Sequence, residues 1–303
     1  MKELNYEKVF NTLVEETANY VTSNGLKAMV LGISGGIDST VVAAICHEVS
    51  KKTDIPLIGR SLPIKNKNDE FATSVHVGEA FCNEFSVYRL ERSYRAALFD
   101  ACADAGDVNM ANSYYLDELE EMPNRTPIAN GNLQARCRMM YLYDIASRHK
   151  GLVMSTDNQT EYQLGFWTIH GDVGDFDPIQ DLWKTEVYRL ARWICDYYTM
   201  MSDGEDVDKI QAIRESVALT PTDGLGISNS DLEQIGARTY YDVDRVLQTL
   251  ICKASPENDK LQDSLEQELG REVVHKIIKR HTASEFKRKK APIYITREKY
   301  END

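Results

Sequence analysis

Residues 28–40 read AMVLGISGGIDST, and this stretch decides the fold. The run AMVLGI is short and continuously apolar, which is typical of a strand buried on both faces of a parallel sheet. The polar turn SGGIDS follows without a gap, and an apolar helical pattern begins at Thr40. A buried strand that leads through a tight turn into a helix is the first half of a βαβ unit, so the segment predicts an α/β fold.

Strand and helix patterns alternate on both sides of this segment. Strands joined by helices form right-handed βαβ units, so we expect a doubly wound parallel sheet with helices on both faces. Further strands are predicted for residues 55–62, 85–90 and 151–156, and helices for residues 5–23, 40–49, 69–83, 93–105 and 132–149.

The remaining chain holds polar interruptions and a helical end. Residues 106–126 carry few packing side chains and are predicted to be mobile. Beyond Trp183 the pattern is helical only, with a polar loop at 217–230. We therefore expect one domain over residues 1–303, with a core at about 26–200 and a helical C-terminal elaboration at about 201–303.

Composition limits the partners and the location. With 42% hydrophobic residues among 303, the chain can bury a large core. The 48 acidic and 35 basic residues give a formal charge of −13, which argues against duplex nucleic acid or an anionic membrane as the main partner. The six cysteines form no C-x-x-C pair, and no apolar run reaches the ~18 residues of a membrane span. Because the charged N-terminus is also unlike a signal peptide, we expect a cytoplasmic protein.

The turn at residues 34–39 has the properties of a phosphate site. Its two glycines let the backbone approach an anion, and N–H groups at the start of the following helix point toward it. The hydroxyl groups of Ser34, Ser39 and Thr40 can add donors. Asp38 would repel a phosphate unless a cation lies between them, and Mg²⁺ bridging Asp38 to pyrophosphate removes that conflict. The alternative is a plain helix-capping turn, and the pattern matches neither a Walker loop nor a dinucleotide fingerprint.

A second polar segment, STDNQTE at residues 155–161, follows the predicted strand 151–156. In a parallel sheet this position places Thr156 and Glu161 on the same rim as the phosphate turn. Glu161 could supply a second carboxylate for Mg²⁺, although an isolated surface acid is the alternative.

A third segment, GDVGDFDP at residues 171–178, contains three acids that do not match the EF-hand spacing. One of these acids could accept hydrogen bonds from ribose or an amide, and the choice among Asp172, Asp175 and Asp177 stays open. Lys184, at the start of the next helix, can reach back to phosphate, or it can be an ordinary surface lysine.

The phosphate turn resembles that of the ATP-pyrophosphatase family, whose members adenylate a substrate and release pyrophosphate. With the downstream motifs, the resemblance over about residues 5–295 is to the NAD synthetase family, which implies a Rossmann-like fold of the adenine nucleotide alpha hydrolase type. These motifs are GNLQARCRM at 131–139, STDNQTE at 155–161, GDVGDFDP at 171–178, DLWK at 181–184, TPT at 220–222, YD at 241–242 and EFKR at 285–288.

This resemblance implies a role for individual residues. Asp38 and Glu161 would hold Mg²⁺, and Asp38, Lys184 and Asp175 would be catalytic. Contacts to ATP are implied for Gly32, Ile33, Ser34, Gly35, Gly36, Ile37, Asp38, Ser39, Thr156, Lys184 and Thr222. Contacts to deamido-NAD are implied for Arg136, Asp175, Lys287 and Arg288, and the family is homodimeric.

The reaction that the resemblance implies amidates deamido-NAD through an acyl-adenylate. Because the chain lacks the amidase domain of glutamine-using relatives, free ammonia is the expected nitrogen donor. The sequence departs from the small ammonia-dependent members at Ile169-His170 and at Phe286, which concerns substrate contacts more than ATP contacts. The alternatives are another amidating or adenylating ligase with this loop, such as a tRNA-modifying or GMP-type synthetase, and an ATP-binding sensor without turnover.

Overall fold

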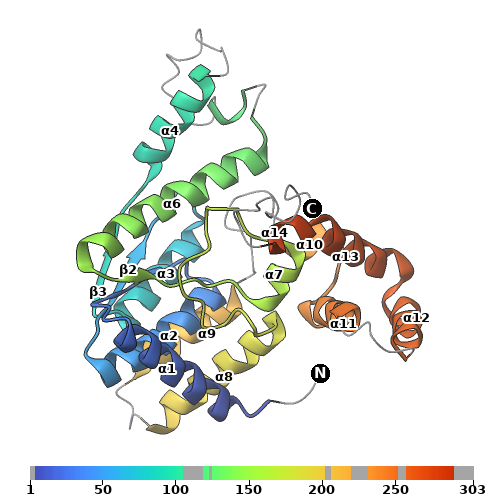
Figure 1. Ribbon diagram of the computed structural model, residues 1–303, viewed down its shortest axis with the longest axis horizontal. Coiled ribbons are helices and arrows are strands. Elements are labelled where there is room, and N and C mark those ends of the chain that lie inside the picture. The colour runs from blue at the N-terminus through green and yellow to red at the C-terminus, as the bar shows by residue number, and fades with distance from the viewer. Residues whose placement is uncertain are drawn as a thin grey trace, which may run out of the picture.

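A four-stranded parallel sheet lies at the centre of the protein (Figure 1). The computed structural model describes residues 4–104, 119–122, 125–201, 206–219, 231–251 and 257–289. The strands are β1 (Met29–Gly32), β2 (Leu57–Ser61), β3 (Glu84–Val87) and β4 (Leu152–Val153), in the spatial order β3-β2-β1-β4. In register, Met29 pairs with Leu57 on one side and with Leu152 on the other. The predicted doubly wound α/β fold is therefore confirmed.

Alternation along β1 divides the core into two layers. Met29 and Leu31 point into one hydrophobic cluster, whereas Val30 points into a second cluster on the opposite face. The first face is covered by α1 (Tyr6–Ser23), α2 (Ile37–Thr53), α3 (Asn68–Phe81), α8 (Lys184–Met201) and α9 (Val207–Ala218). The second face is covered by α6 (Pro127–His149), which lies across the sheet from α1 and α2, whereas α4 (Glu91–Asp104) packs against α6 and projects away from the sheet (Figure 1).

The strand order creates a crevice where the chain changes direction. From β1 the chain moves outward through β2 and β3, and β4 then pairs with the free side of β1. Ligands of open α/β sheets bind at such a switch point, outside the carboxyl ends of the strands. The phosphate turn leaves β1 there, and residues 155–161 leave β4 beside it.

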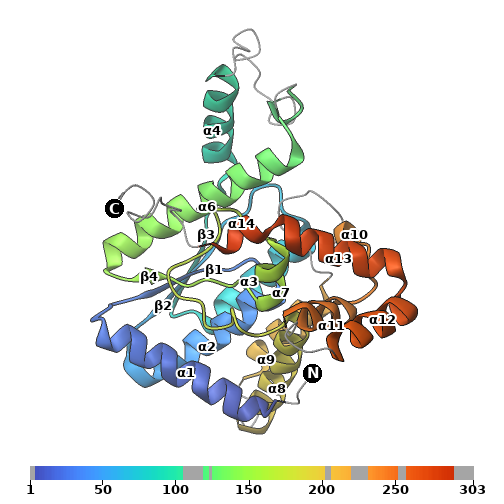
Figure 2. The same ribbon diagram turned by 45° about the vertical axis from the view of Figure 1, so that its right-hand side comes forward.

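The C-terminal helices form a third cluster beside the sheet. They are α10 (Asp231–Ile235), α11 (Tyr240–Ile251), α12 (Glu257–Leu269), α13 (Arg271–Ala283) and α14 (Glu285–Arg288), and Figure 2 shows them gathered next to α7 (Gln159–Leu164). Leu164 of α7 is fully buried in this cluster with Val243 and Ile277. The short helix α7 therefore joins the C-terminal helices to the crevice.

Several boundaries differ from the prediction. Helix α6 begins at Pro127 rather than at residue 132, because the Thr126 side chain caps it and proline is favourable in the first turn. The predicted strand 151–156 contains only two strand residues, after which Met154 forms a single bridge to Phe176. Helix α7 lies where a loop was expected, since Asn158 and Glu161 form a capping box. Most of the polar stretches 106–126 and 217–230 falls outside the described residues.

Candidate active site

Hydrogen bonds of its own hydroxyl groups stabilise the conformation of the phosphate turn. Ser34 Oγ lies 3.0 Å from Ser39 Oγ and accepts a hydrogen bond from the Gly36 N–H at 3.2 Å. Gly35 has φ +87°, and a Cβ atom there would lie 2.6 Å from the carbonyl oxygen of Glu70 in α3. Only glycine fits this position, so the close packing of the turn against α3 depends on Gly35.

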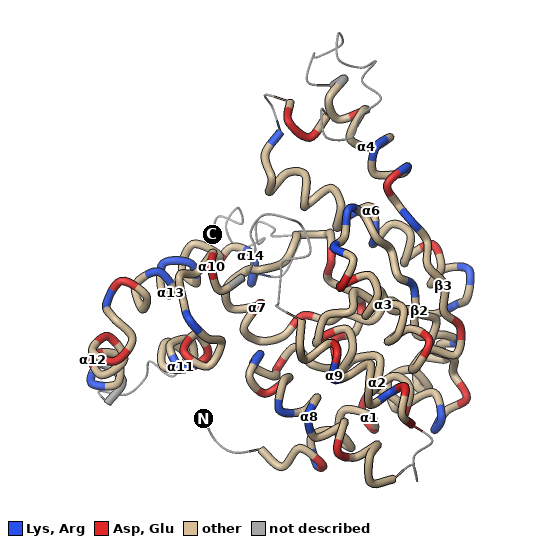
Figure 3. Tube along the Cα trace, turned by 180° about the vertical axis from the view of Figure 1, so that it is seen from behind, with Lys and Arg blue, Asp and Glu red and all other residues tan. Residues whose placement is uncertain are grey.

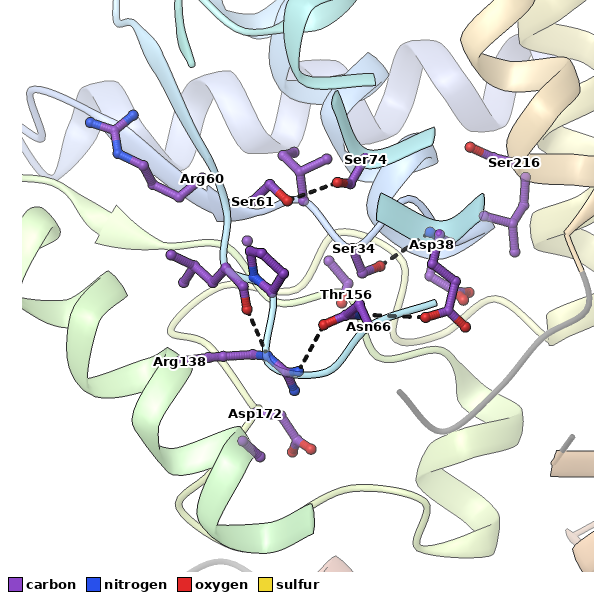
Figure 4. Close-up of a pocket in the computed structure, with 18 of the residues that line it drawn as sticks. Ser34, Asp38, Arg60, Ser61, Asn66, Ser74, Arg138, Thr156, Asp172 and Ser216 are labelled. Carbon is purple, nitrogen blue, oxygen red and sulfur yellow. Dashed lines mark hydrogen bonds between the residues drawn. The ribbon is translucent and has the colours of Figure 1, made fainter. Parts of the chain in front are cut away.

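A hydrogen bond also joins the turn to α9, the helix that precedes residues 220–230. Thr40 Oγ1 lies 2.7 Å from Ser216 Oγ of α9, and both side chains are buried. Ser216 and Leu219 line the pocket next to the turn, and Figure 4 shows Ser216 there. Thr222, which the resemblance places on ATP, lies outside the described residues.

Asp38, Glu161 and Lys184 meet at the mouth of the crevice. Lys184 Nζ lies 2.5 Å from Asp38 Oδ2 and 3.0 Å from Glu161 Oε1, so one ammonium group bridges both carboxylates. The lysine side chain is only 3% exposed. Its burial is the largest influence on its pKa and acts to lower it, but the attraction of Asp38 and Glu161 outweighs burial and holds the pKa well above its ordinary value.

Helix α7 holds Glu161 in place at its first turn. The Asn158 side chain accepts a hydrogen bond from the Glu161 N–H at 3.1 Å, and Glu161 reaches back to the Asn158 N–H. Asn158 also donates to Asp38 Oδ1 at 2.9 Å. This asparagine therefore links the two acids. Its role was not predicted, although an N-cap residue followed by glutamate at the third helical position is the sequence pattern of a capping box.

The opposite end of the pocket contains a half-buried arginine and an acid. Arg138 of α6 donates to the Leu62 carbonyl at 3.1 Å and to Asn66 Oδ1 at 3.4 Å, beside Asp172 (Figure 4). Burial raises the pKa of Asp172 to about 6, against hydrogen bonds from Thr168 and the nearby charges of Lys287 and Arg138. Thr156, at the end of β4, lies between this end and the phosphate turn.

Two residues that the resemblance assigned to substrate lie outside the pocket wall. Arg136 is exposed and donates to the Ile169 carbonyl at 3.1 Å, whereas Arg138, two positions later on the same helix, lines the pocket. Asp175 accepts from the Tyr143 hydroxyl and from the Val153 N–H, both at 2.9 Å, so it lies along the edge of β4. Among the three open acids of residues 171–178, Asp172 is the one that lines the pocket.

Lys287 and Arg288 occupy the C-terminal end of α7. Arg288 donates to the Gln163 carbonyl at 2.7 Å, and Lys287 donates to the Gly165 carbonyl at 2.7 Å and to the carbonyl of Trp167. Basic residues continue along α13 and α14 (Figure 3). Cations are favourable at a helix C-terminus, where carbonyl groups lack partners, so this basic cluster stabilises α7.

Two further acids lie behind the carboxylate pair. Asp157 accepts from Ser155 Oγ at 2.8 Å, and burial raises its pKa well above the usual range. Asp177 accepts from the Ile179 N–H at 3.0 Å, and burial raises its pKa to about 7. Both acids therefore keep their protons to higher pH than an ordinary aspartate does, and neither lines the pocket.

The donor set fits a magnesium ion held together with a nucleotide. Asp38 and Glu161 already share one cation, the Lys184 ammonium, and carboxylate oxygens are the protein ligands that Mg²⁺ prefers. Within the described ranges, no group of three or more His, Cys, Asp or Glu side chains could hold a metal alone. Such a site suits an ion that takes its remaining ligands from phosphate and water.

The fold and this site define an ATP-dependent enzyme of the ATP-pyrophosphatase-loop class. A phosphate turn at the switch point, two carboxylates and a buried lysine together provide the parts that a metal-bound triphosphate needs. The chain belongs to the NAD synthase family, whose model matches residues 9–291, and it is therefore an ATP-dependent ligase.

Known relatives agree with this assignment. The chain is 28% identical to the NH(3)-dependent NAD(+) synthetase of Fusobacterium nucleatum, over 95% of both chains. It is also 28% identical to the glutamine-dependent NAD(+) synthetase of Aquifex aeolicus, but it spans only 45% of that protein.

Solved structures share the fold at lower identity. The NH3-dependent NAD synthetase of Campylobacter jejuni superposes with a TM-score of 0.64 at 23% identity, over 96% of this chain and all of the other. The NMN synthetase of Francisella tularensis superposes with a TM-score of 0.70, also at 23% identity, over 96% of this chain and 99% of the other. No helix among the described residues is long and apolar enough to cross a membrane.

Proposed function

We propose that the protein is an ammonia-dependent NAD synthetase, which converts deamido-NAD, ATP and ammonia to NAD, AMP and pyrophosphate. The observation that carries this proposal is the Asp38–Lys184–Glu161 cluster beside the phosphate turn, in a chain that matches the family along nearly its whole length. Full-length similarity to NH(3)-dependent enzymes supports ammonia as the donor.

The first step activates a carboxylate. The nicotinate carboxylate attacks the α-phosphorus of ATP, the bond to the bridging oxygen breaks, and pyrophosphate leaves. Main-chain N–H groups of the turn and the Lys184 ammonium would neutralise the charge that develops on pyrophosphate. Bound Mg²⁺, held by Asp38 and Glu161, would add charge neutralisation at the phosphate oxygens.

The second step forms the amide. Ammonia attacks the carbonyl carbon of the acyl-adenylate, and AMP leaves with the bonding electron pair. The Arg138–Asp172 end of the pocket suits the nicotinate half of the substrate, because an arginine can orient a carboxylate and an ionised aspartate can accept the proton that the nitrogen loses after ammonia has added. On this geometry Asp172 is a better candidate than Asp175 for the acid beside the reacting group.

Thr156 and Ser34 would contact the ATP phosphates from the two sides of the crevice. Arg136, Lys287 and Arg288 remain predicted contacts to the rest of the dinucleotide. The homodimer, the single-domain organisation and a cytoplasmic location also remain predictions.

Turnover with defined substrates tests the proposal. Purified protein is given ATP, Mg²⁺ and deamido-NAD with either ammonium or glutamine, and AMP, pyrophosphate and NAD are measured. We expect equimolar AMP and NAD with ammonium and little with glutamine, and the Asp38→Asn variant should release no pyrophosphate.

Other acids serve as competing substrates in the same assay. Nicotinate mononucleotide is one of them, since a protein of this fold is described as an NMN synthetase. Pyrophosphate release with another acid but not with deamido-NAD would refute the assigned substrate while leaving the ATP site intact. No release with any acid would instead favour an ATP-binding sensor.

A further inference from the structure

Asp244 is a fully buried carboxylate that the proposed reaction does not use. It lies on α11, among the C-terminal helices, and is 0% exposed. Thr160 Oγ1 donates to its Oδ1 at 2.5 Å, and the N–H and hydroxyl of Thr185 donate to its Oδ2 at 3.0 and 2.7 Å. Burying a charge is costly unless hydrogen bonds replace water, so these three bonds account for how the fold tolerates it.

Each of the two threonines is next in sequence to Glu161 or Lys184, which lie beside Asp38 in the candidate active site. Thr160 precedes Glu161 in α7, and Thr185 follows Lys184 at the start of α8. Thr160 Oγ1 also accepts from the Lys184 N–H at 2.9 Å. Asp244 therefore fastens the first turns of two helices to each other, and those two turns carry Glu161 and Lys184.

The hydrogen-bond inventory requires a carboxylate rather than an amide. Three donors converge on the two oxygens of Asp244, and an asparagine has one acceptor oxygen and one NH₂ donor. With the NH₂ group toward Thr185, two N–H groups would face each other. With the NH₂ group toward Thr160, the threonine hydroxyl would lose its acceptor. Either orientation breaks part of the link between α7 and α8.

We propose that Asp244 is a positioning residue that sets the separation of Glu161 and Lys184 for the metal-bound nucleotide. The role of this pair rests on the proposed function. Helix α7 has only six residues, and so short a helix is marginal without outside contacts, so it cannot hold Glu161 in place relative to Lys184 by itself. The anionic Asp244 also stabilises the N-terminus of α8, where N–H groups lack helical partners.

The test compares Asp244→Asn with Asp242→Asn. Both changes remove one charge from the same helix, but Asp242 bonds locally to Thr239 and contacts neither Thr160 nor Thr185. Affinity for Mn²⁺ with α,β-methylene ATP is measured by electron paramagnetic resonance, alongside kcat, the KM for each substrate and thermal unfolding. For Asp244→Asn we expect about a tenfold weaker Mn²⁺–nucleotide affinity and at least a tenfold lower kcat, whereas Asp242→Asn should stay within about twofold of the wild type.

If Asp244→Asn does not fold, variants of Thr160 test the same positioning role. Thr160→Ser keeps the hydroxyl and should retain wild-type affinity, whereas Thr160→Val keeps the shape, loses the hydroxyl and should weaken affinity several-fold. The proposal is overturned if Asp244→Asn or Thr160→Val is less stable but binds Mn²⁺ and nucleotide as the wild type does.

The test of Asp244 can be distinguished from the test of the proposed function. The nucleotide analogue binds without deamido-NAD, so the binding result does not depend on which acid the enzyme amidates. If the wild type does not use deamido-NAD but both variants bind Mn²⁺ and nucleotide more weakly, the substrate assignment is refuted and the role of Asp244 is supported.

Discussion

Replacing Lys184 with methionine should convert a site whose two carboxylates share one ammonium into one that binds a divalent ion without nucleotide. The Lys184 ammonium lies 2.5 Å from an oxygen of Asp38 and 3.0 Å from one of Glu161. Lys184→Met keeps much of the side-chain volume and removes only the charge. Two partly buried carboxylates, 15% and 18% exposed, then face each other without a shared cation.

The magnitude follows from the charges and their burial. At an effective dielectric constant of about 20 and these separations, each ion pair is attractive by roughly 5–7 kcal/mol before desolvation of the lysine is subtracted. Breaking a buried pair by removing one partner typically costs ~3–5 kcal/mol. Because both carboxylates retain some contact with water, we expect the lower end, about 3 kcal/mol less stability at neutral pH. The same loss of a competing cation should strengthen Mn²⁺ binding to the nucleotide-free protein by about tenfold or more.

The assay combines urea unfolding with Mn²⁺ titration followed by electron paramagnetic resonance. Millimolar Mg²⁺ should restore most of the stability of Lys184→Met and add little to the wild type, because a ligand stabilises only the state that binds it. Lys184 lies over the ring of Tyr240 in addition to its ion pairs. Lys209→Met is the matched control, since Lys209 likewise combines an ion pair, with Asp206, and a contact with a tyrosine ring, that of Tyr198. Equal Mn²⁺ affinity in the wild type and Lys184→Met would refute the reasoning.

Three further changes test other parts of the site. Gly35→Ala should raise the KM for ATP at least tenfold, because a Cβ atom at φ +87° would lie 2.6 Å from the Glu70 carbonyl oxygen; an unchanged KM would contradict the close packing of the turn. Asp177 has a pKa of about 7 in the folded protein, above the ~3.9 of an unfolded chain, so the folded state binds the extra proton and this acid lowers stability as pH rises from about 4 to 7. Asp177→Asn should therefore gain up to about 4 kcal/mol in urea unfolding at pH 8 and almost nothing at pH 4, and the reverse order would show the sign to be wrong. Arg288→Met should lower stability by about 1–2 kcal/mol and speed amide hydrogen exchange in α7, since the Gln163 carbonyl loses a charged donor. A higher KM for deamido-NAD in this variant would support the substrate contact that the family resemblance implies. An unchanged exchange rate in α7 would exclude the capping role.

Local patterns predicted much of the fold and the phosphate half of the site. The apolar run before the turn and the spacing of the downstream strands were enough for a parallel sheet with helices on both faces, because a strand buried on both faces is a short, continuously apolar run between polar turns. Asp38, Glu161 and Lys184 were predicted to act together, and they lie within hydrogen-bond distance. Adjacent strand ends bring such residues together in any doubly wound sheet.

The substrate half could not be predicted in the same way. Arg136 and Arg138 are two positions apart on one helix, and only the packing of α6 against the sheet determines which of them faces the pocket. The turn at residues 171–178 has the same ambiguity, since its path along β4 turns Asp172 inward and leaves Asp175 at the sheet edge.

The sequence by itself determined the class of fold, through short-range patterns of burial and turn geometry, and the family, through the resemblance of several separate motifs. It also predicted where ATP binds, from the turn after the first strand. Only the tertiary structure decided that Lys184 lies between the two carboxylates, that Lys287 and Arg288 cap α7, and that Asp244 holds two helix ends from 59 or more residues away. Contacts across such separations depend on how whole helices pack, and no local pattern of residues encodes that packing.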